Sequence, residues 1–257
     1  MTPPTDISSA IPDLQDFPRP NVAVDVAVLS VVQVENRPQL VALAHVREGG
    51  WAEGQWALPG RMLRPGDTLA QTAQDAVRLK LGLDEISLRQ LRVFDEPDRD
   101  PRGWVLSVAH VGTVPAHVAQ WSRNNPHVNY IFAYQDEFEF PNNQSTLPFE
   151  QREILREAVK DLRLKYSVLP DPGNMLEDGF TMLQLREIHE AVLGEEIQPD
   201  TFRREMMPNL EPTGRQSSGS VGKPAMTYRR VHSQSSSVRS PSRSSRGARR
   251  YNPEDVL

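Results

Sequence analysis

The 257-residue sequence contains no cysteine, which excludes disulfides, thiol nucleophiles and cysteine-ligated zinc. It also lacks an apolar run close to the roughly 18 residues that a membrane-spanning helix needs, so we expect no membrane association. The first 20 residues have neither a basic start nor an apolar stretch, and this Pro-rich segment fits a disordered leader better than a signal peptide. These absences predict a protein of the reducing cytoplasm.

Acidic residues are missing from a long segment near the C-terminus. From Pro212 to Pro253 the sequence has nine of its 29 basic residues and neither Asp nor Glu. Before Pro212, the other 20 basic residues stand against 32 of the 34 acids, a net charge of about −12. An acidic body with a basic end indicates a polyanion partner at that end. The Ser/Arg-rich residues 232–257 are also typical of a disordered tail, which need not bind anything.

The stretch from Leu58 to Leu83, LPGRMLRPGDTLAQTAQDAVRLKLGL, lacks the acids of the motif that it otherwise resembles. In the Nudix box, glutamates three and four positions apart share one helix face and hold Mg²⁺ against a diphosphate. Here three residues without carboxylates stand at the glutamate positions, and an arginine replaces the first loop glycine. These residues are Ala76, Leu79, Lys80 and Arg61. The segment therefore indicates a Nudix fold without a magnesium site or a catalytic residue.

A plain amphipathic helix is the alternative explanation of this segment. Leu69, Ala73, Val77 and Leu81 recur at a spacing of four, which forms an apolar stripe, and Gly82 is an ordinary helix stop. This alternative accounts for the helix but not for the LPG and PGDTL sequences before it. We therefore favour the Nudix interpretation.

The order of elements in the first two thirds of the chain predicts an α/β/α sandwich. Alternating apolar residues predict strands over 22–34 and 40–46, joined as a hairpin by a polar turn. Helical spacing of apolar residues predicts helices over 69–81 and 149–165. Further strands are expected at 88–94, 105–114 and 128–134. These elements suit a mixed sheet between helices.

A different pattern follows the segment 166–179, which we interpret as a linker. Thr181 and Gln184 form a capping box that opens a helix. A short turn leads to a second helix from Thr201, and two strands around a Gly/Ser/Lys loop come next. This order predicts a winged helix-turn-helix over 180–231, whose second helix enters the major groove of DNA. A helical hairpin for dimerisation, with its arginines in solvent, is the alternative.

Side chains of this second unit are the candidates for contact with DNA. Arginine recognises guanine edges and phosphates, and lysine holds phosphates. Adjacent helix positions point about 100° apart, so we expect only one of Arg203 and Arg204 to read bases. On a strand, likewise, only one of Arg229 and Arg230 should face DNA. The candidate set is Thr201, Arg203, Arg204, Arg215, Lys223, Arg229 and Arg230.

Four segments carry a resemblance to one known family. They are WALPGRM at 56–62, DEPDRDPRGWVLSVAHVGTVP at 95–115, LPFEQREIL at 147–155, and the elements between KYSVLPDP and GKPAMTYR. Through them the chain resembles the Nudix-related transcriptional regulators of bacterial NAD metabolism, the NrtR family. Two departures stand out. Glu150 and Gln151 replace an Asp-His sequence that is common there, and the box lacks the acids with which some members hydrolyse ADP-ribose.

The resemblance implies a division of the chain and a set of partners. We expect a leader at 1–20, a Nudix-like effector and dimerisation domain at 21–165, a linker at 166–179, a winged helix-turn-helix at 180–231 and a tail at 232–257. The implied partners are a palindromic double-stranded DNA operator and ADP-ribose or another NAD-pathway metabolite, bound by a homodimer. The implied function is repression of genes for NAD biosynthesis or salvage, at the nucleoid, with neither cofactor nor metal.

Five residues of the Nudix-like half are candidates to clamp a diphosphate and stack an adenine. They are Arg47, Trp56, Arg61, Arg99 and Arg102. Two of them have a plainer alternative. Trp56 fits a core position, and Arg99 lies between two aspartates that could satisfy it within one turn.

A nucleoside-diphosphate hydrolase with a displaced metal site is the second function class. It needs at least three carboxylates converging in the cleft, for which Asp67, Glu96 and Asp98 are the candidates. A third class is an adaptor that binds a protein through the vacated groove. The missing acids of the box favour the regulator.

Overall fold

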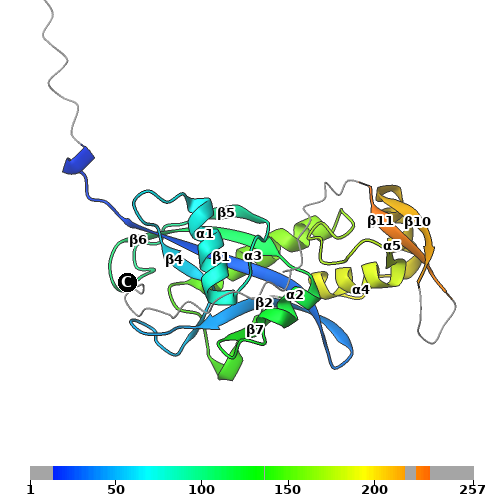
Figure 1. Ribbon diagram of the computed structural model, residues 1–257, viewed down its shortest axis with the longest axis horizontal. Helices are drawn as coiled ribbons and strands as arrows, with labels where there is room; N and C mark the ends of the chain where they lie inside the picture. The colour runs from blue at the N-terminus through cyan, green and yellow to red at the C-terminus, as the bar shows by residue number, and fades with distance from the viewer. Residues whose placement is uncertain (1–13, 136, 218–223, 232–257) are drawn as a thin grey trace, which may run out of the picture.

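The chain folds into two units of unequal size (Figure 1). The computed structural model describes residues 14–135, 137–217 and 224–231. In these ranges an eight-stranded sheet between helices forms the larger unit, and a three-stranded sheet with two helices forms the smaller one. The predicted α/β class, a sandwich followed by a smaller helix-and-hairpin unit, is confirmed.

The centre of the large sheet is β1 (Asn21–Val34). It pairs antiparallel with β2 (Arg37–Val46) and parallel with β6 (Val105–Thr113). Ten consecutive residues of β1 are buried, because helices cover both faces of the sheet. The hairpin turn at Glu35 and Asn36 has φ values of 49° and 63°, which a two-residue turn requires.

The other strands extend the sheet on both sides in the order β5-β6-β1-β2-β7-β8. Two short strands, β3 and β4, pair with β2 and β1 and hold the LPG loop against the sheet. The remaining bounds are β3 (Trp56–Ala57), β4 (Gly60–Met62), β5 (Leu88–Phe94), β7 (Val128–Tyr134) and β8 (Glu137–Glu139). The segments predicted at 88–94 and 128–134 have the bounds that we expected.

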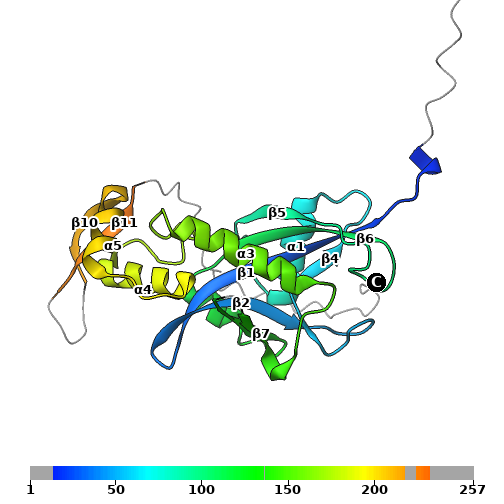
Figure 2. The same ribbon diagram turned by 180° about the vertical axis from the view of Figure 1, so that it is seen from behind.

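One face of the sheet packs on α1 (Leu69–Leu81) and α2 (Ala116–Ser122), and the other packs on α3 (Gln151–Tyr166) and α4 (Met182–Leu193), as Figures 1 and 2 show from opposite sides. Thr68 and Gln71 form a capping box at the start of α1, and Gly82 ends the helix with φ of 70°. Short 3-10 turns lie at Leu14–Asp16 (η2), Pro141–Asn143 (η3) and Met207–Asn209 (η4).

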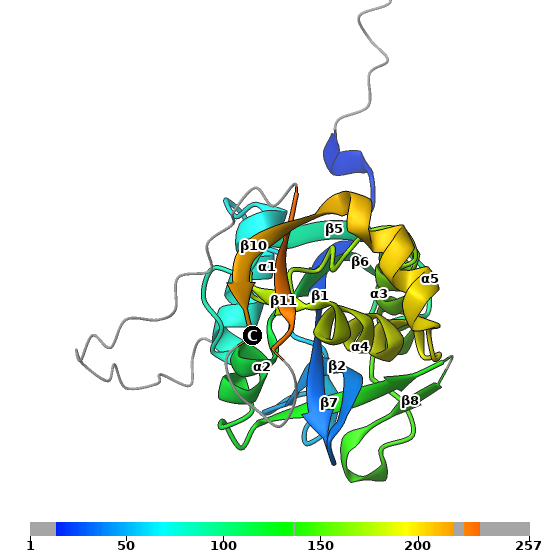
Figure 3. The same ribbon diagram turned by 90° about the vertical axis from the view of Figure 1, so that its right-hand side faces the viewer.

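The smaller unit begins with β9 (Phe180–Thr181) and α4, and continues through α5 (Pro199–Met206), β10 (Leu210–Gln216) and β11 (Met226–Arg230). The capping box of Thr181 and Gln184 is present as predicted. Its sheet has the order β10-β11-β9. Leu185, Phe202 and Tyr228 are central to its own hydrophobic core. Figure 3 looks onto this unit, with α5 and the β10–β11 hairpin in front.

The connection between the two units is tightly packed. Tyr166 and Asp171 are fully buried within the segment that we interpreted as a linker. The hydroxyl of Thr113 on β6 donates a hydrogen bond of 2.6 Å to the carbonyl of Gly173. Ile188 and Val192 of α4 also belong to the core of the larger unit. We interpreted this segment as a linker from its sequence, since composition does not reveal which polar groups become buried.

None of the described helices combines the length and apolar character needed to cross a bilayer.

Candidate functional site

A cluster of aromatic and cationic side chains lies beside the end of β2. The guanidinium carbons of Arg47 and Arg102 lie 4.9 and 4.8 Å from the ring centroid of Phe149. The half-exposed ring of Trp51 is 5.7 Å from the same centroid, with 44° between the planes. Cations over an aromatic face are attracted to it, so Phe149 holds both arginines in place. We refer to Arg47, Trp51, Arg102 and Phe149 as the arginine–aromatic cluster.

Sequence reasoning missed Trp51 and Phe149. Phe149 was assigned to the helical stripe of residues 149–165, but it precedes α3 and has φ of 56°. Because of this left-handed backbone, the Phe149 ring does not continue the apolar stripe of α3. Trp51 lies in a Gly-rich turn without a periodic pattern. An aromatic residue close to Arg47 in sequence was the only available signal.

Arg99 is a structural residue and not an open diphosphate clamp. Its side chain is 1% exposed and donates a hydrogen bond of 2.9 Å to the carbonyl of Phe149. A second nitrogen–oxygen distance, to Asp25, is 3.5 Å. The charge of Arg99 is therefore paired inside the protein, and its hydrogen bond to the Phe149 carbonyl helps to fix the arginine–aromatic cluster. The prediction that it contacts the effector is corrected on this point.

Asp25 and Gln151 tie the LPG loop to the sheet. The amide of Gln151 donates 2.7 Å to the Asp25 carboxylate and accepts 2.8 Å from the backbone nitrogen of Leu58. Ser107 donates to the other carboxylate oxygen at 2.5 Å. Only glycine fits at position 60, because a Cβ there would overlap the Asp25 carboxylate. The departure from the family sequence at Gln151 thus has a structural role.

Arg102 keeps part of its surface open while Asp100 holds it. Two of its nitrogens donate to the Asp100 carboxylate at 2.9 and 2.7 Å, and its side chain is 42% exposed. Burial alone would raise the pKa of Asp100, but hydrogen bonds from Arg102 outweigh this and hold the pKa below its usual value. The alternative interpretation, in which the neighbouring aspartates satisfy Arg99, is wrong, because Asp100 pairs with Arg102 and Arg99 bonds to the Phe149 carbonyl. Arg102 still reaches solvent.

Lys80, on α1, brings a further positive charge to the same region. Burial lowers its pKa, Glu48 raises it, and the charges of Arg47 and Arg61 lower it again. Arg61, on β4, lies 3.7 Å from Asp75 of α1. Both arginines are therefore near enough for their charges to act on Lys80. We call these three residues the cationic triad.

Trp56 is a core residue, which corrects its assignment as a stacking platform. Its side chain is 7% exposed and lies in the core beneath α3. Its backbone nitrogen and carbonyl are both bound by the side chain of Gln144, at 2.7 and 2.9 Å. A large apolar residue at the start of a paired strand is more often buried than exposed. The sequence alone did not distinguish the two cases.

The acids proposed for a displaced metal site do not converge. Asp67, Glu96 and Asp98 are all exposed. Among the residues that the structure describes, three or more His, Asp or Glu side chains nowhere gather as metal ligands would. At the box itself Ala76 is fully buried in the core under α1, and Leu79 is half exposed. The arrangement does not fit Mg²⁺, which requires clustered oxygen ligands.

The predicted arginines of the smaller unit lie on helix α5 and on the β10–β11 hairpin, two elements that Figure 3 shows in front. Phe202 and Met206 bury one side of α5, and Arg203 and Arg204 are exposed. The backbone nitrogen of Thr201 donates 2.6 Å to Gln198, so this residue lies in the capped first turn. The second helix of the predicted motif is therefore anchored by its apolar side and carries its charges outward.

The hairpin supplies two of the remaining candidates. Arg215 on β10 is exposed, and Arg229 on β11 is exposed beside Glu211, at a nitrogen–oxygen distance of 2.9 Å. Lys223 lies outside the described residues. An exposed pair of this kind is worth little to stability, so Arg229 is available to exchange its partner for a phosphate.

Arg230 does not face DNA, contrary to its place in the candidate set. Its side chain is 11% exposed and lies 2.5 Å from the Asp171 carboxylate. It also donates 2.9 Å to the carbonyl of Leu176 and lies over the ring of Phe180 at 5.3 Å. The alternation of side chains along a strand correctly predicted that Arg229 and Arg230 face different ways. The partner of Arg230, 59 positions earlier in the chain, was invisible in the sequence.

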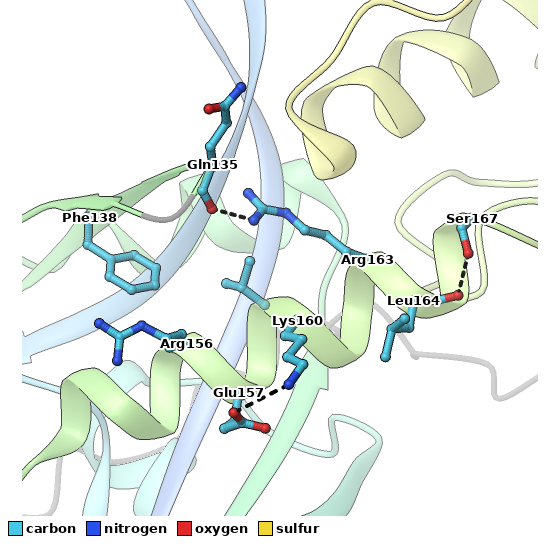
Figure 4. A pocket seen from close by; sticks show the side chains of 9 residues that line it. Gln135, Phe138, Arg156, Glu157, Lys160, Arg163, Leu164 and Ser167 are labelled. Carbon is cyan, nitrogen blue, oxygen red and sulfur yellow. Dashed lines mark hydrogen bonds and ion pairs between the residues drawn. The ribbon is translucent and has the colours of Figure 1, made fainter.

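A separate hollow of about 490 Å³ lies along the outer side of α3, next to the end of β7 (Figure 4). Its basic side chains already have partners: Lys160 is 3.9 Å from Glu157, and Arg156 pairs with Glu153. Arg163 donates 2.9 Å to the carbonyl of Val192, at the end of α4. None of the predicted site residues lines this hollow. Of these three basic residues, Arg163 links α3 to α4, whereas the two ion pairs lie within α3.

Comparison with known proteins finds relatives of both the larger and the smaller unit. Residues 172–230 match the family described as NrtR DNA-binding winged helix domain. The chain is 28% identical over 219 residues to the "ADPR responsive transcriptional repressor NtrR" of Acinetobacter baylyi, and the alignment covers 83% of each chain. It is 26% identical over 141 residues to the "ADP-ribose pyrophosphatase" of Methanocaldococcus jannaschii, covering 55% of this chain and 74% of that one.

A solved structure supports the same arrangement. Shewanella oneidensis NrtR, crystallised with a 27mer DNA, has a TM-score of 0.67 and 25% sequence identity to this chain. The superposition covers 80% of this chain and 92% of that one, so it includes both units. Residues 172–230 thus match the NrtR winged helix family, and the chain as a whole is similar in fold to an NrtR protein.

Proposed function

We propose that this protein is a transcriptional repressor of NAD biosynthesis or salvage genes that binds a DNA operator and responds to ADP-ribose or a related nucleotide. One observation carries the proposal. Within the unit that matches the NrtR winged helix family, α5 exposes Arg203 and Arg204 beside a hairpin carrying Arg215 and Arg229. Cations on a helix and an adjacent wing are what a duplex backbone and its major groove bind. Such a protein acts at the chromosome.

The effector site in this proposal is the arginine–aromatic cluster together with the cationic triad. An adenine stacks on aromatic rings and guanidinium planes, and a diphosphate binds arginine and lysine. Trp51 and Arg102 are exposed enough to meet a ligand. The Acinetobacter relative is named for its response to ADPR, which supports this class of effector.

The Nudix-fold domain acts in this proposal as a sensor without turnover. Ala76, Leu79 and Lys80 supply no carboxylate to bind a metal, and the other acids of the region lie apart or are paired. Hydrolysis of a diphosphate in this fold relies on metal-bound water and charge neutralisation. A chain without the metal ligands keeps the cleft but cannot hydrolyse a diphosphate by this route.

The test of the proposal is binding of the full-length protein to duplexes from its own genomic neighbourhood, measured by fluorescence anisotropy. We expect tight binding to one or a few duplexes, and a change of affinity when ADP-ribose is added. Arg203→Ala combined with Arg204→Ala should abolish specific binding. Arg156→Ala, which removes an exposed arginine of α3, is the matched control and should bind normally.

Three results would contradict the proposal. If the double variant binds DNA as tightly as the parent protein, the winged helix does not carry the DNA-binding function. Affinity that never responds to NAD-pathway nucleotides would remove the sensor. Metal-dependent release of AMP from ADP-ribose by the purified protein would favour the hydrolase instead.

A further inference from the structure

One side chain of α4 lies between the last turn of α3 and the second helix of the winged helix unit, α5. The ring of His189 has no exposed surface and lies between two buried aromatic rings. It contacts Tyr166, the last residue of α3, at a centroid distance of 4.8 Å and an angle of 60°. It contacts Phe202 of α5 at 4.9 Å and 69°. Both contacts have the edge-to-face geometry that aromatic rings favour.

The His189 ring stands between the hydrophobic cores of the two units. Tyr166 belongs to the core of the larger unit, and Phe202 belongs to the core of the smaller one. Leu176 also packs against both cores, but it lies in the connecting segment and not on a helix. Through His189, α3 of the larger unit is therefore linked to α5 by a row of three rings.

Polar contacts hold the His189 ring in one orientation. Its Nε2 accepts a hydrogen bond of 3.2 Å from the backbone nitrogen of Asp171. That nitrogen belongs to a fully buried residue, so a rotated ring would leave it unpaired at a cost. The hydroxyl of Tyr166 donates to the carboxylate of the same aspartate. Two of the three rings are thus fixed by one residue, and the row cannot adjust freely.

On both sides of His189, α4 is anchored on the larger unit. Ile188 and Val192 are buried in the core of that unit. Arg163 of α3 donates 2.9 Å to the carbonyl of Val192, near the end of α4. The backbone that carries His189 therefore stays in place on the larger unit, and the ring is a fixed support for α5.

The position of Phe202 decides where α5 directs its exposed side chains. Phe202 is 2% exposed, and the exposed Arg203 and Arg204 follow it directly. Side-chain tips lie about 5–6 Å from a helix axis, so a rotation of roughly 20° moves them by about 2 Å. Such a shift breaks a hydrogen bond, because donor and acceptor must lie within about 3.2 Å. Without the His189 ring, a cavity beside Phe202 would leave room for this rotation.

We infer that His189 is a positioning residue for operator recognition: its ring, held between Tyr166 and Phe202, fixes the orientation of α5 relative to the larger unit. This inference rests on the proposed function and adds to it a buried residue that acts through α5. In the expected dimer the same contact fixes the separation of the two recognition helices. The spacing of the operator half-sites therefore depends on this ring.

The first test measures the orientation of α5 in the full-length protein without DNA. The chain has no cysteine, so spin labels can be attached at Lys160→Cys on α3 and Glu205→Cys on α5, two exposed positions. Dilution with unlabelled protein restricts pulsed electron resonance to distances within one protomer. We expect one narrow distance distribution in the parent and in His189→Phe, which keeps a ring. In His189→Ala the distribution should be about twice as broad, because the space of the ring is left empty.

Ile188→Ala is the matched control, because Ile188 is the neighbouring buried residue of α4 and belongs to the core of the larger unit. It should lower the thermal midpoint and leave the distribution narrow. Phe202→Leu removes the ring contact from the side of α5 by a milder change and should broaden the distribution, which keeps the test valid if His189→Ala does not fold. A narrow distribution in Phe202→Leu or His189→Ala, or a broad one in His189→Phe or Ile188→Ala, would overturn the inference.

The second test uses operator duplexes whose half-site spacing is changed by one base pair. The parent should lose at least about tenfold in affinity on the altered spacing, whereas His189→Ala should lose less than about threefold. An equal loss in both proteins would contradict the positioning role. If the parent binds no duplex at all, the proposed function fails, and the distance measurement alone decides whether His189 orients α5.

Discussion

Arg203 and Arg204 are neighbours in sequence and differ in direction. Phe202 and Met206 define the buried side of α5, and at 100° per residue Arg204 points almost directly away from it. Arg203 is turned toward the wing, where its nitrogen lies 3.5 Å from the Tyr228 hydroxyl. We therefore expect Arg204 to read a base and Arg203 to contact the backbone.

The prediction concerns the two single alanine variants. Arg204→Ala should lose about 1–3 kcal/mol and relax the preference at one operator position. Arg203→Ala should weaken all sequences alike and flatten the salt dependence. Anisotropy titrations over a set of duplexes with single base-pair changes, at two salt concentrations, measure both effects. The reverse pattern would mean that the orientation of α5 on DNA is different.

Arg230 and Arg229 are adjacent cations with opposite roles. Arg230 neutralises the buried Asp171 carboxylate, whereas Arg229 forms an exposed pair with Glu211. Removing one partner of a buried pair leaves an uncompensated charge, so Arg230→Ala should lower the free energy of unfolding by about 3–5 kcal/mol. Arg229→Ala should change it by less than about 1 kcal/mol. Urea unfolding of the two variants makes the comparison. Equal effects would show that the Asp171 contact is dispensable.

His189 gives the protein a dependence on acid pH. Burial lowers its pKa from 6.5 to about 4, while its nitrogen accepts a hydrogen bond of 3.2 Å from the backbone of Asp171. The unfolded chain binds the proton near pH 6.5 and the folded chain near pH 4, so unfolding takes up a proton between these values. The stabilisation is complete above pH 6.5 and is lost as the pH falls toward 4, by roughly 3 kcal/mol.

The measurement is the midpoint of thermal unfolding between pH 4 and pH 7. His189→Gln retains a side chain that accepts a hydrogen bond and does not titrate, so its midpoint should fall less than that of the parent protein over this range. His45 has a similarly lowered pKa of about 4 and remains in both proteins. Parallel curves for the two proteins would mean that His189 is not buried in its neutral form.

At the scale of elements, α1 shows why the box cannot be repaired by restoring its acids. Ala76 has no exposed surface and packs in the core with Val77 and Leu81. A glutamate there would bury a carboxylate without a partner, whereas at the half-exposed Leu79 it would reach solvent. At position 76 the helix therefore packs into the core instead of offering a carboxylate.

We expect Ala76→Glu, with or without Leu79→Glu and Lys80→Glu, to lower stability by several kcal/mol and to give no hydrolysis of ADP-ribose with Mg²⁺. Leu79→Glu alone is the control and should be nearly neutral. Unfolding curves and a coupled assay for AMP measure the two outcomes. Turnover by the triple variant would mean that α1 shifts enough to reopen a metal site.

The elements that could be predicted from the sequence are those whose caps and apolar patterns lie within the element itself. The helix over 69–81 has a capping threonine and a glycine stop, and the strand at 128–134 is rich in β-branched and aromatic residues. The short α2, β3, β4, β8 and β9 were missed because they are too brief to show a period. The roles of Arg99 and Arg230 depend on acids far away along the chain, and a charge in a sequence does not reveal whether folding pairs it.

At the scale of the whole molecule, the distribution of charge predicts how the protein meets DNA. Arg203, Arg204, Arg215 and Arg229 are exposed together on α5 and the wing, so this end should approach a duplex, and two protomers are needed to place recognition helices one DNA turn, about 34 Å, apart. With roughly six to ten phosphates neutralised, affinity should fall about 10³- to 10⁵-fold between 50 and 200 mM salt.

Light scattering of the free protein and of its operator complex tests this expectation. We expect a dimer in both, bound to one palindromic duplex, with the stated salt dependence. The large domain alone, residues 21–166, should not shift DNA, because it lacks α5 and the wing. A monomer that binds one site tightly at micromolar concentration is the result that would contradict the expectation.

The buried junction around Asp171 restricts how an effector can act. Its carboxylate accepts hydrogen bonds from Tyr166 of α3, from Arg230 of β11 and from two backbone nitrogens, and α4 shares its packing with both domains. A hinge after Leu176 would break the contact between Asp171 and Arg230 and would pull α4 away from the core of the larger domain. We therefore expect the two domains of one protomer to move together as a rigid body. On this basis, we expect a ligand in the cleft to alter DNA binding by changing the angle between the two protomers of a dimer, and we expect no such response from an isolated protomer.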